Sequence, residues 1–299
     1  MHCTITEHNE DNQNLQATPY SLYKHIFLIV DLFFYFCDYS LIEVKEIHKK
    51  GCTSDPCNYR PISLTSTCCR VMERIINNSI LNYLLDNSLI TKHQHGFIRK
   101  RSTCTNLLES LHDWTLNLQN KKKTDVIYFD FKKAFDTVSH PKLLTKLKAY
   151  GLTGSLHFWV SEFLRERTQI VKIKDNYSHS LSVISGVPQG SVLGPTLFLL
   201  YINDVCDLFA DLSVSLKLYA DDIKLYSHCD VSSSSDLDSA IGQICNWSNT
   251  WQLQIAVDKC FCVISLLRSV LHIRIIVLIM YHFPRLIRSV ILVLLSTHH

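Results

Sequence analysis

Apolar and polar positions along the chain predict helices and strands that alternate from residue 45 onwards. Residues 71–85 and 103–119 show helical spacing, and one face of the second segment is apolar, with Leu107, Leu108, Leu111, Trp114 and Leu118. Residues 169–186 and 214–227 instead alternate in the manner of β-hairpins, the first with its turn at KDNY. Strands interspersed with helices predict an α/β or α+β domain.

The remaining apolar segments continue this alternation. VIYFDF at 126–131 has the β-branched and aromatic content of a buried strand, and a turn and a helix that ends at Gly151 follow it. Residues 191–209 are apolar enough for a buried helix. Residues 236–264 predict a helix and then a strand.

Two adjacent aspartates interrupt the second hairpin. Asp221 and Asp222 lie at the centre of LKLYADDIKLYS, an otherwise strand-like run at 216–227. Successive side chains of a strand point to opposite faces, so both carboxylates can reach one site only if the chain turns there. Asp130 lies in the buried-strand pattern at 126–131, and pairing of the two strands would bring its carboxylate alongside.

Carboxylates gathered in this way need a counter-charge. Two of them about 4 Å apart repel by roughly 4 kcal/mol at an effective dielectric constant near 20. Oxygen ligands from few side chains, with coordination positions left for phosphate and water, are typical of Mg²⁺ sites, and paired Mg²⁺ ions catalyse phosphoryl transfer. The alternative is that Asp221 and Asp222 are ordinary polar turn residues, as adjacent aspartates often are.

A glycine-rich loop precedes the apolar helix predicted over 191–209. GVPQGSVLGP holds three of the eight glycines of the chain, together with Pro188 to stiffen the loop and Gln189 as both donor and acceptor. Such a loop can lie against a nucleotide or a template base without a side chain in the way. The alternative is a plain turn from strand to helix.

The composition of the chain predicts a buried core, and its charge distribution shows one basic region. Apolar residues make up 47% of the 299 residues, which is enough to bury a substantial core. The net charge of +3 is small, but residues 89–172 contain 15 Lys and Arg against 7 Asp and Glu. This clustering is typical of a face that binds a polyanion, although runs of lysine are also common in solvated loops.

Five motifs in a fixed order resemble one enzyme family. FDFKKAFDTVSH, GVPQGSVLGPTLF and YADD resemble motifs A, B and C of reverse transcriptases. NYRPISL and HGFIRKRST resemble the two preceding finger motifs of non-LTR, LINE-type, jockey-like retrotransposon enzymes. The resemblance covers residues 45–264. It implies an α+β fold with the fingers and palm of a right-hand polymerase, in which an antiparallel palm sheet packs on helices.

The resemblance implies a catalytic metal site. Asp130, Asp221 and Asp222 match the family's metal-binding aspartates, and the backbone carbonyl of Phe131 is available to a second ion. The cofactor would be two Mg²⁺ ions, with Mn²⁺ as a substitute. The implied reaction is attack of a primer 3′-hydroxyl on the α-phosphate of a deoxynucleoside triphosphate, with release of pyrophosphate.

The resemblance also implies nucleotide contacts. Arg60 would reach the triphosphate, because a guanidinium stays charged and binds phosphate through two hydrogen bonds. Phe135 matches the aromatic gate that excludes a ribose 2′-hydroxyl, although a core phenylalanine would fit the same pattern. Gln189 and Gly190 would lie against the nucleotide. Lys259, in VDKC, resembles a lysine placed as an acid near the pyrophosphate, but it could equally be a surface lysine.

Nucleic-acid contacts are expected from the RKR run. Arg99, Lys100 and Arg101 would bind the template backbone without regard to sequence. Their spacing departs slightly from that of the family, because Ile98 stands before them. Asp136, also in motif A, is assigned a structural or capping role.

The family pattern divides the chain and is incomplete at its ends. It implies a fingers-like region at 45–123 and a palm at 124–264, after a divergent segment at 1–44. An apolar tail with interspersed arginines at 265–299 stands where the primer grip and thumb are expected. We therefore expect the thumb to be absent and extension by this chain alone to be poor. A non-catalytic remnant that binds nucleic acid is the alternative function, and an RNA-templated RNA polymerase is disfavoured by Phe135.

Neither strongly apolar segment predicts a membrane span. Residues 26–37 are too few and contain Asp31, and the tail is interrupted by arginines, whereas a spanning helix needs about 20 apolar residues. The twelve cysteines form no CxxC pair, which is typical of free thiols in a reducing compartment. We expect an intracellular protein of the cytoplasm or nucleus that is not secreted, with an RNA template, a DNA primer and deoxynucleotides as partners and with no membrane.

The tail leads to a first prediction. We expect residues 265–299 to be translated out of frame from a decayed or mispredicted copy of a longer gene, because they match no family motif. The genomic nucleotide sequence around codon 265 should then resume a thumb-like sequence in another frame. The hypothesis fails if neither alternative frame contains such a sequence.

Overall fold

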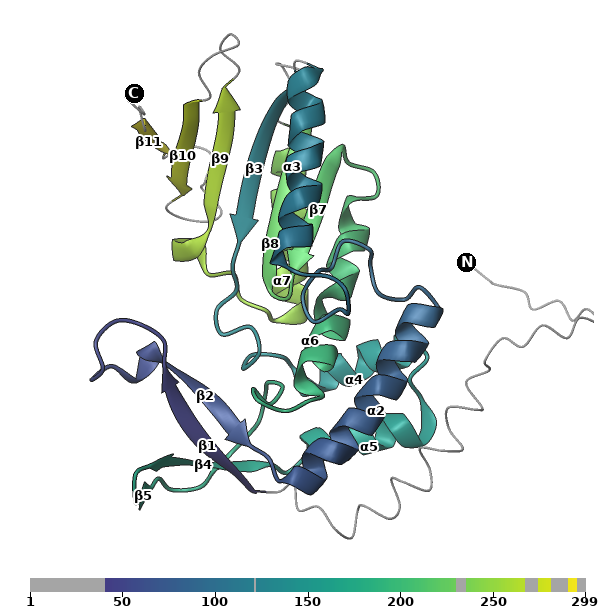
Figure 1. Cartoon of the computed structure of the whole chain (residues 1–299), viewed down its shortest axis with the longest axis vertical. Coiled ribbons are helices and arrows are strands. Elements are labelled where there is room, and N and C mark those ends of the chain that lie inside the picture. The colour runs from purple at the N-terminus through teal and green to yellow at the C-terminus, as the bar shows by residue number, and fades with distance from the viewer. Residues whose placement is uncertain (1–40, 121, 230–234, 267–273, 281–289, 295–299) are drawn as a thin grey trace, which may run out of the picture.

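Two β-sheets and the helices packed around them make up the fold (Figure 1). The computed structural model describes residues 41–120, 122–229, 235–266, 274–280 and 290–294. The expectations for residues 1–40 lie outside the described residues. No helix within the described ranges is long and apolar enough to cross a bilayer.

The smaller sheet brings together strands from both halves of the chain. Its order is β2-β1-β4-β5, with β6 also paired to β4, and the strands are β1 (Leu41–His48), β2 (Tyr59–Leu64), β4 (Thr168–Ile173), β5 (Asn176–Tyr177) and β6 (Leu181–Ser182). β1 is antiparallel to β2 but parallel to β4. The hairpin predicted over 169–186 is confirmed as β4 and β5. These pairings cross the expected boundary at residue 124, and the division into domains stays a prediction.

The larger sheet is antiparallel throughout and has the order β11-β10-β9-β3-β8-β7. Its strands are β3 (Lys123–Phe129), β7 (Val214–Tyr219), β8 (Asp222–Cys229), β9 (Phe261–Leu266), β10 (Arg274–Met280) and β11 (Val290–Leu294). The predicted hairpin at 214–227 is confirmed. The strand predicted at 126–131 is present as β3, but it begins at Lys123 and ends at Phe129, so Asp130 and Phe131 follow it. Two pieces of the tail thus add strands to this sheet, while its reading frame stays a prediction.

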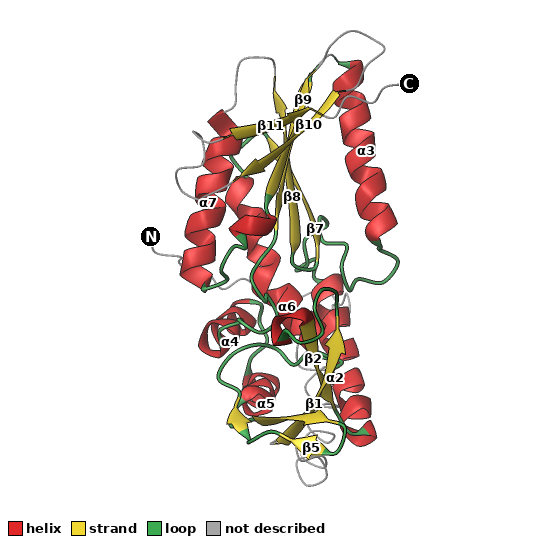
Figure 2. Cartoon of the chain, turned by 90° about the vertical axis from the view of Figure 1, so that its left-hand side faces the viewer, coloured by secondary structure: helices red, strands yellow, loops and turns green. Residues whose placement is uncertain are grey.

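Helices cover both faces of the larger sheet (Figure 2). A continuous hydrophobic core joins this sheet and α7 (Ser235–Trp251) to α6 (Gly194–Ile202) and, beyond it, to α4 (His140–Ala149) and α5 (Gly154–Leu164). The 3-10 segment η2 (Asn203–Phe209) extends α6, and there Asp204 accepts a hydrogen bond from the buried indole of Trp247. α6 is nearly all apolar because it is buried on every side.

The helix α3 (Thr103–Gln119) has the predicted bounds but turns the opposite face inward. Leu107, Leu108 and Leu111 are between 44% and 64% exposed. Asn106 and Ser110 are buried instead, and they accept hydrogen bonds of 2.9 Å and 2.8 Å from the Lys224 ammonium. The sheet face under α3 contains a buried lysine, which needs oxygen partners, so the polar side of the helix packs there.

A buried glutamate joins the fingers-like region to α6. Glu73 lies on α2 (Thr67–Asp86), has no exposed surface, and accepts hydrogen bonds from the N–H groups of Val192 (2.7 Å) and Leu193 (3.1 Å). Burial raises the pKa of Glu73, and the two backbone hydrogen bonds partly offset the rise. This contact fixes the end of the glycine-rich loop against α2.

Replacement of Glu73 tests this junction. Glu73→Leu should lower the free energy of unfolding by about 2 kcal/mol, because two buried N–H groups lose their acceptor. The matched variant Glu162→Leu loses only a surface ion pair with Arg165 at 3.5 Å, and its cost should stay below about 0.5 kcal/mol. Urea unfolding measures both values. Equal stabilities for the two variants would show that Glu73 does not hold the loop.

Candidate active site

Strand pairing brings the three predicted aspartates to one edge of the larger sheet. In the antiparallel ladder of β3 and β8, Phe129 pairs with Ile223, so the next residues, Asp130 and Asp222, stand across from each other. Asp222 also closes the β7–β8 hairpin opposite Tyr219. The turn between β7 and β8 consists of two residues, the second of which is Asp221. The turn that the sequence required is therefore present.

The carboxyl groups at this edge repel one another. Burial is the main cause that raises the pKa of Asp221, and the Asp130 carboxylate adds to the rise. Burial, together with Asp221 and Asp130, raises the pKa of Asp222 to about 6. A hard divalent cation binds carboxylate oxygens and would neutralise the repulsion among these three groups. By their chemistry, the residues fit the predicted metal site.

Lys259 provides a positive charge at the same edge. It lies in the 3-10 segment η3 (Val257–Lys259), and its ammonium is 3.2 Å and 3.3 Å from the two carboxylate oxygens of Asp130. In the described part of the chain, no three Asp, Glu, His or Cys side chains converge tightly enough to enclose an ion as they stand. A cation bound by Asp130 would therefore have to displace the Lys259 ammonium from its carboxylate.

Just after β3, the backbone at Phe131 is held by a short bridge, and the expected contact of its carbonyl with a second ion stays a prediction. Phe131 and Ile255 face each other in an isolated antiparallel bridge. The bridge is made by the neighbouring groups, from Lys132 N–H to the carbonyl of residue 254 and from Ala256 N–H to the carbonyl of Asp130, each at 2.8 Å. The carbonyl of Phe131 is not consumed by this bridge.

The glycine-rich loop docks on β2, the strand that carries Arg60. The Ser63 N–H donates to the Gln189 carbonyl at 2.7 Å. Gly190 has a φ of +96°, and a Cβ there would lie 2.8 Å from the Ser63 carbonyl oxygen, so the close approach requires glycine. Arg60 is exposed and lies close enough to lower the pKa of Asp221 slightly.

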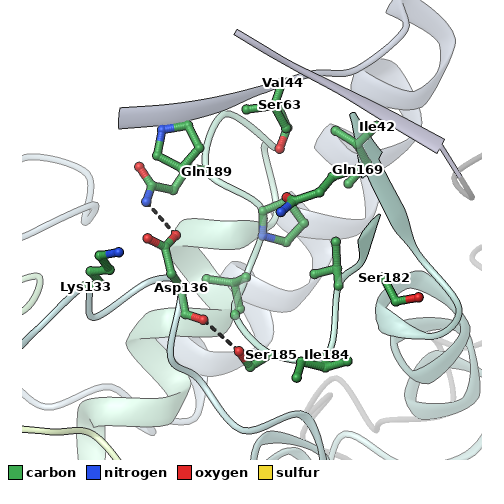
Figure 3. A pocket seen from close by; sticks show the side chains of 15 residues that line it. Ile42, Val44, Ser63, Lys133, Asp136, Gln169, Ser182, Ile184, Ser185 and Gln189 are labelled. Atoms are coloured by element: carbon green, nitrogen blue, oxygen red, sulfur yellow. Dashed lines mark hydrogen bonds between the residues drawn. The ribbon is translucent and has the colours of Figure 1, made fainter. Parts of the chain in front are cut away.

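Asp136 orients the side chain of Gln189 (Figure 3). The Gln189 amide donates to the Asp136 carboxylate at 2.7 Å, and the Ser185 hydroxyl donates to the Asp136 carbonyl at 2.9 Å. These residues line a cavity of about 310 Å³ that also contacts Lys133 and β1. The hydrogen bond agrees with the structural role expected for Asp136.

Phe135 is half-buried between two aromatic rings. Its ring stacks on Phe198 of α6 with centroids 4.5 Å apart, and the Phe97 ring meets it edge-on at 6.1 Å. This packing agrees with the alternative that Phe135 is a core phenylalanine, and it also holds the ring in one orientation. Its function as a gate stays a prediction.

Of the RKR run, only the first two residues are exposed. Arg99 and Lys100 are exposed, whereas Nη1 of Arg101 donates to the carbonyls of Thr91 (3.4 Å), Lys92 (2.7 Å) and Gln94 (2.5 Å). This guanidinium braces the preceding loop through Nη1, and the expected template contact of Arg101 stays a prediction.

A second cavity contains residues that the sequence analysis missed. It has a volume of about 460 Å³ and lies beside Asp130 and Asp222, where the rings of Tyr128 and Phe261 stack with centroids 4.5 Å apart. Lys224 also lines it. The position of Lys224 beside the aspartates could have been predicted from strand alternation, since residues 222 and 224 lie on the same face of β8.

Comparison with known proteins agrees with this geometry. The family model described as reverse transcriptase (RNA-dependent DNA polymerase) matches residues 47–274. The chain belongs to this family. The resemblance to reverse transcriptases is confirmed, and so is the family-level assignment as an RNA-directed DNA polymerase.

Relatives of this reverse transcriptase domain come from transposable elements. It is 31% identical over 264 residues to the RNA-directed DNA polymerase from mobile element jockey of Drosophila melanogaster, covering 84% of this chain and 28% of the relative. It is 28% identical over 279 residues to a probable RNA-directed DNA polymerase from transposon BS of the same species, covering 85% and 30%. The chain thus spans less than a third of these relatives. The predicted non-LTR relationship is confirmed.

Solved structures share the fold of this reverse transcriptase domain. Apo telomerase from Candida tropicalis, truncated from its C-terminal domain, superposes with a TM-score of 0.59 at 14% identity, over 80% of this chain and 53% of that one. This likeness shows the fold alone, and it confirms the predicted α+β arrangement of fingers and palm.

The charge at the site predicts how stability depends on pH. The pKa of Asp222 rises from its ordinary 3.8 to about 6 in the fold, so the folded carboxyl keeps a proton that the unfolded chain has released between these values. The free energy of unfolding should therefore fall as the pH rises through this window. Asp222→Asn avoids that loss and should be more stable than the parent chain at pH 7. The gain should be about 1 kcal/mol or less because the Asp222 side chain, although partly surrounded by protein, still reaches solvent that screens its charge.

Urea unfolding in a chelator between pH 4 and pH 8 measures the difference. The advantage of Asp222→Asn should vanish towards pH 4 and shrink in high salt. A variant less stable than the parent at pH 7 would contradict the repulsion inferred among the three carboxylates.

Proposed function

We propose that this domain catalyses RNA-templated addition of deoxynucleotides to a primer 3′-hydroxyl. One observation carries the proposal: the β3–β8 register sets Asp130 opposite Asp222, with Asp221 in the adjoining turn. Membership of the reverse transcriptase family supports the same chemistry. Because the chain spans less than a third of its transposon relatives, the activity of the whole protein is part of the proposal.

The three aspartates and the Phe131 carbonyl would hold two Mg²⁺ ions, which Mn²⁺ could replace. Reverse transcriptases as a family use divalent cations, and the raised pKa values of Asp221 and Asp222 support a cation at this edge. When bound, such ions activate the attacking hydroxyl and stabilise the leaving oxygen. The residues of the chain would position the primer hydroxyl and the triphosphate and would neutralise part of the phosphate charge.

Two cationic side chains would neutralise part of the negative charge of the triphosphate. Lys259 now pairs with Asp130, and once released its ammonium could donate to the pyrophosphate as it leaves. Arg60 would bind the triphosphate from the side of β2. Its electrostatic effect on Asp221 supports a position within reach of the same site.

Motif residues would shape the nucleotide pocket. Asp136 orients the Gln189 amide, and Gly190 keeps the loop thin where it meets β2. The Phe135 ring is held against Phe198, and we propose that its edge excludes a ribose 2′-hydroxyl. These contacts would select a paired deoxynucleotide.

The template would pass over the exposed Arg99 and Lys100. Both residues precede α3, and their charges would bind phosphates without regard to sequence. Arg101, whose Nη1 braces the loop, would present its remaining guanidinium donors on the same side. A telomerase from Candida tropicalis with this fold has been solved with a fragment of telomeric RNA, which supports an RNA template.

Primer extension tests the proposal. The assay supplies Mg²⁺, an RNA template, a DNA primer and deoxynucleoside triphosphates, and compares the parent chain with Asp221→Asn. Extension should fall by at least about 100-fold, the upper end for groups that support a metal site. The matched variant Asp86→Asn makes the same change at an exposed position at the end of α2 and should extend like the parent.

The outcomes separate the two functions. Extension that survives Asp221→Asn would refute the metal site. Binding of the primer and template without extension, in the parent chain itself, would support the alternative of a non-catalytic remnant. Incorporation of ribonucleotides as readily as deoxynucleotides would contradict the gate at Phe135.

A further inference from the structure

We propose that Gln94 is a positioning residue whose buried amide clamps the backbone of Ala220 and so presents Asp221 and Asp222 to a divalent cation. This inference rests on the proposed function, because it gives Gln94 a role toward the same cation site. Gln94 lies in the loop before α3, far from the hairpin in sequence, and it contacts none of the three carboxylates in any hydrogen bond seen among the described residues.

The turn between β7 and β8 adopts an unfavourable conformation at Ala220. Tyr219 and Asp222 form the last pair of the hairpin, so Ala220 and Asp221 are the two loop residues. Ala220 has a φ of +56°, in the left-handed region that a Cβ disfavours and that hairpins usually fill with glycine, asparagine or aspartate. Contacts from outside the hairpin are needed to favour this conformation.

The side chain of Gln94 supplies those contacts. Its Oε1 accepts from the Ala220 N–H at 2.9 Å, and its Nε2 donates to the Ala220 carbonyl at 3.3 Å. The same Oε1 accepts from the Gly96 N–H at 2.8 Å. Gln94 is only 1% exposed. One amide thus holds both backbone groups of the residue that precedes the paired aspartates.

The loop around Gln94 is shaped for this approach. A Cβ on Gly96 would lie 2.3 Å from the Ala220 nitrogen, so only glycine lets the two backbones come so close. The Leu218 N–H donates to the His93 carbonyl and the His95 N–H donates to the Leu218 carbonyl, both at 2.9 Å. The loop therefore runs along the edge strand β7 and sets Gln94 in register with the turn.

The clamp has a direct consequence for the cation ligands. Asp221 follows Ala220 directly and Asp222 is the next residue, so a change of φ at Ala220 would alter how the turn presents these carboxylates to a cation shared with Asp130. Groups that orient metal ligands typically contribute 10- to 100-fold to metal affinity. A role in fold stability alone would not affect the affinity for a cation in this way.

Binding of Mn²⁺ to the full chain, followed by electron paramagnetic resonance of the free ion, tests the clamp. Gln94→Met keeps the length of the side chain but removes the amide, and it should weaken Mn²⁺ binding by about 10- to 100-fold. The control Asn117→Leu removes another buried amide, one that bonds the Thr124 hydroxyl at 3.0 Å on the far part of α3. It should lower stability and leave Mn²⁺ affinity unchanged.

A rescue variant distinguishes positioning from packing. Ala220→Gly, combined with Gln94→Met, should recover part of the lost affinity, since glycine adopts a positive φ without the clamp. No recovery, together with an affinity loss equal to that of Asn117→Leu, would overturn the proposal. If Gln94→Met fails to fold by circular dichroism, Gln94→Asn, whose amide is one methylene shorter, replaces it under the same criteria.

Asp222→Asn separates this inference from the proposed function. If Asp222→Asn binds Mn²⁺ as tightly as the parent, the cation site itself is wrong and the proposed function falls with it. If Asp222→Asn loses Mn²⁺ while Gln94→Met keeps the affinity of the parent, the site stands and the clamp is overturned.

Discussion

The backbone pairing of β3, β8 and β7 is the constraint on which the candidate site depends, because it holds three carboxylates at one edge of the larger sheet. Asp130, Asp221 and Asp222 are brought together by backbone pairing of β3 with β8 and of β7 with β8. The ladder hydrogen bonds do not depend on side-chain charge, so they can hold groups that would otherwise separate. Burial is the main cause of the raised pKa values of Asp221 and Asp222, and the neighbouring carboxylates add to the rise. A cation near these carboxylates lowers their electrostatic energy, and the ammonium group of Lys259 already pairs with Asp130.

Contacts between the fingers-like segments and the catalytic loops are made mostly through backbone groups. Glu73 binds two N–H groups before α6, Ser63 binds the carbonyl of Gln189, and Gln94 binds both groups of Ala220. These contacts are polar and mostly buried, so each is directional and costly to break. They set the distance between the loop of motif B, the turn of motif C and the strand that carries Arg60. The shape of the site therefore depends on residues that take no direct part in the proposed reaction.

The orientation of α3 shows how one buried charge can override an apolar pattern. Burial of an ammonium without oxygen partners costs more than exposure of several leucines. Lys224 lies on the same face of β8 as Asp222, and Asn106 and Ser110 satisfy it from α3. The leucines of α3 consequently stay outside. The same arrangement leaves a lysine at the wall of the cavity beside the aspartates.

The sequence by itself determined the order of most helices and strands from residue 103 to residue 264, the bounds of α3, the turn at Asp221 and the family, because local periodicity and short motifs encode these features. Only the tertiary structure decided which face of α3 packs inward, that β4 runs parallel to β1, that Arg101 braces a loop, and that Gln94 holds Ala220. Gln94 and Ala220 are 126 positions apart, and Asn106 and Lys224 are 118 positions apart. A hydrophobic pattern describes how each segment meets water. It does not specify which distant polar group will satisfy a buried donor, and that choice is made only when the segments pack.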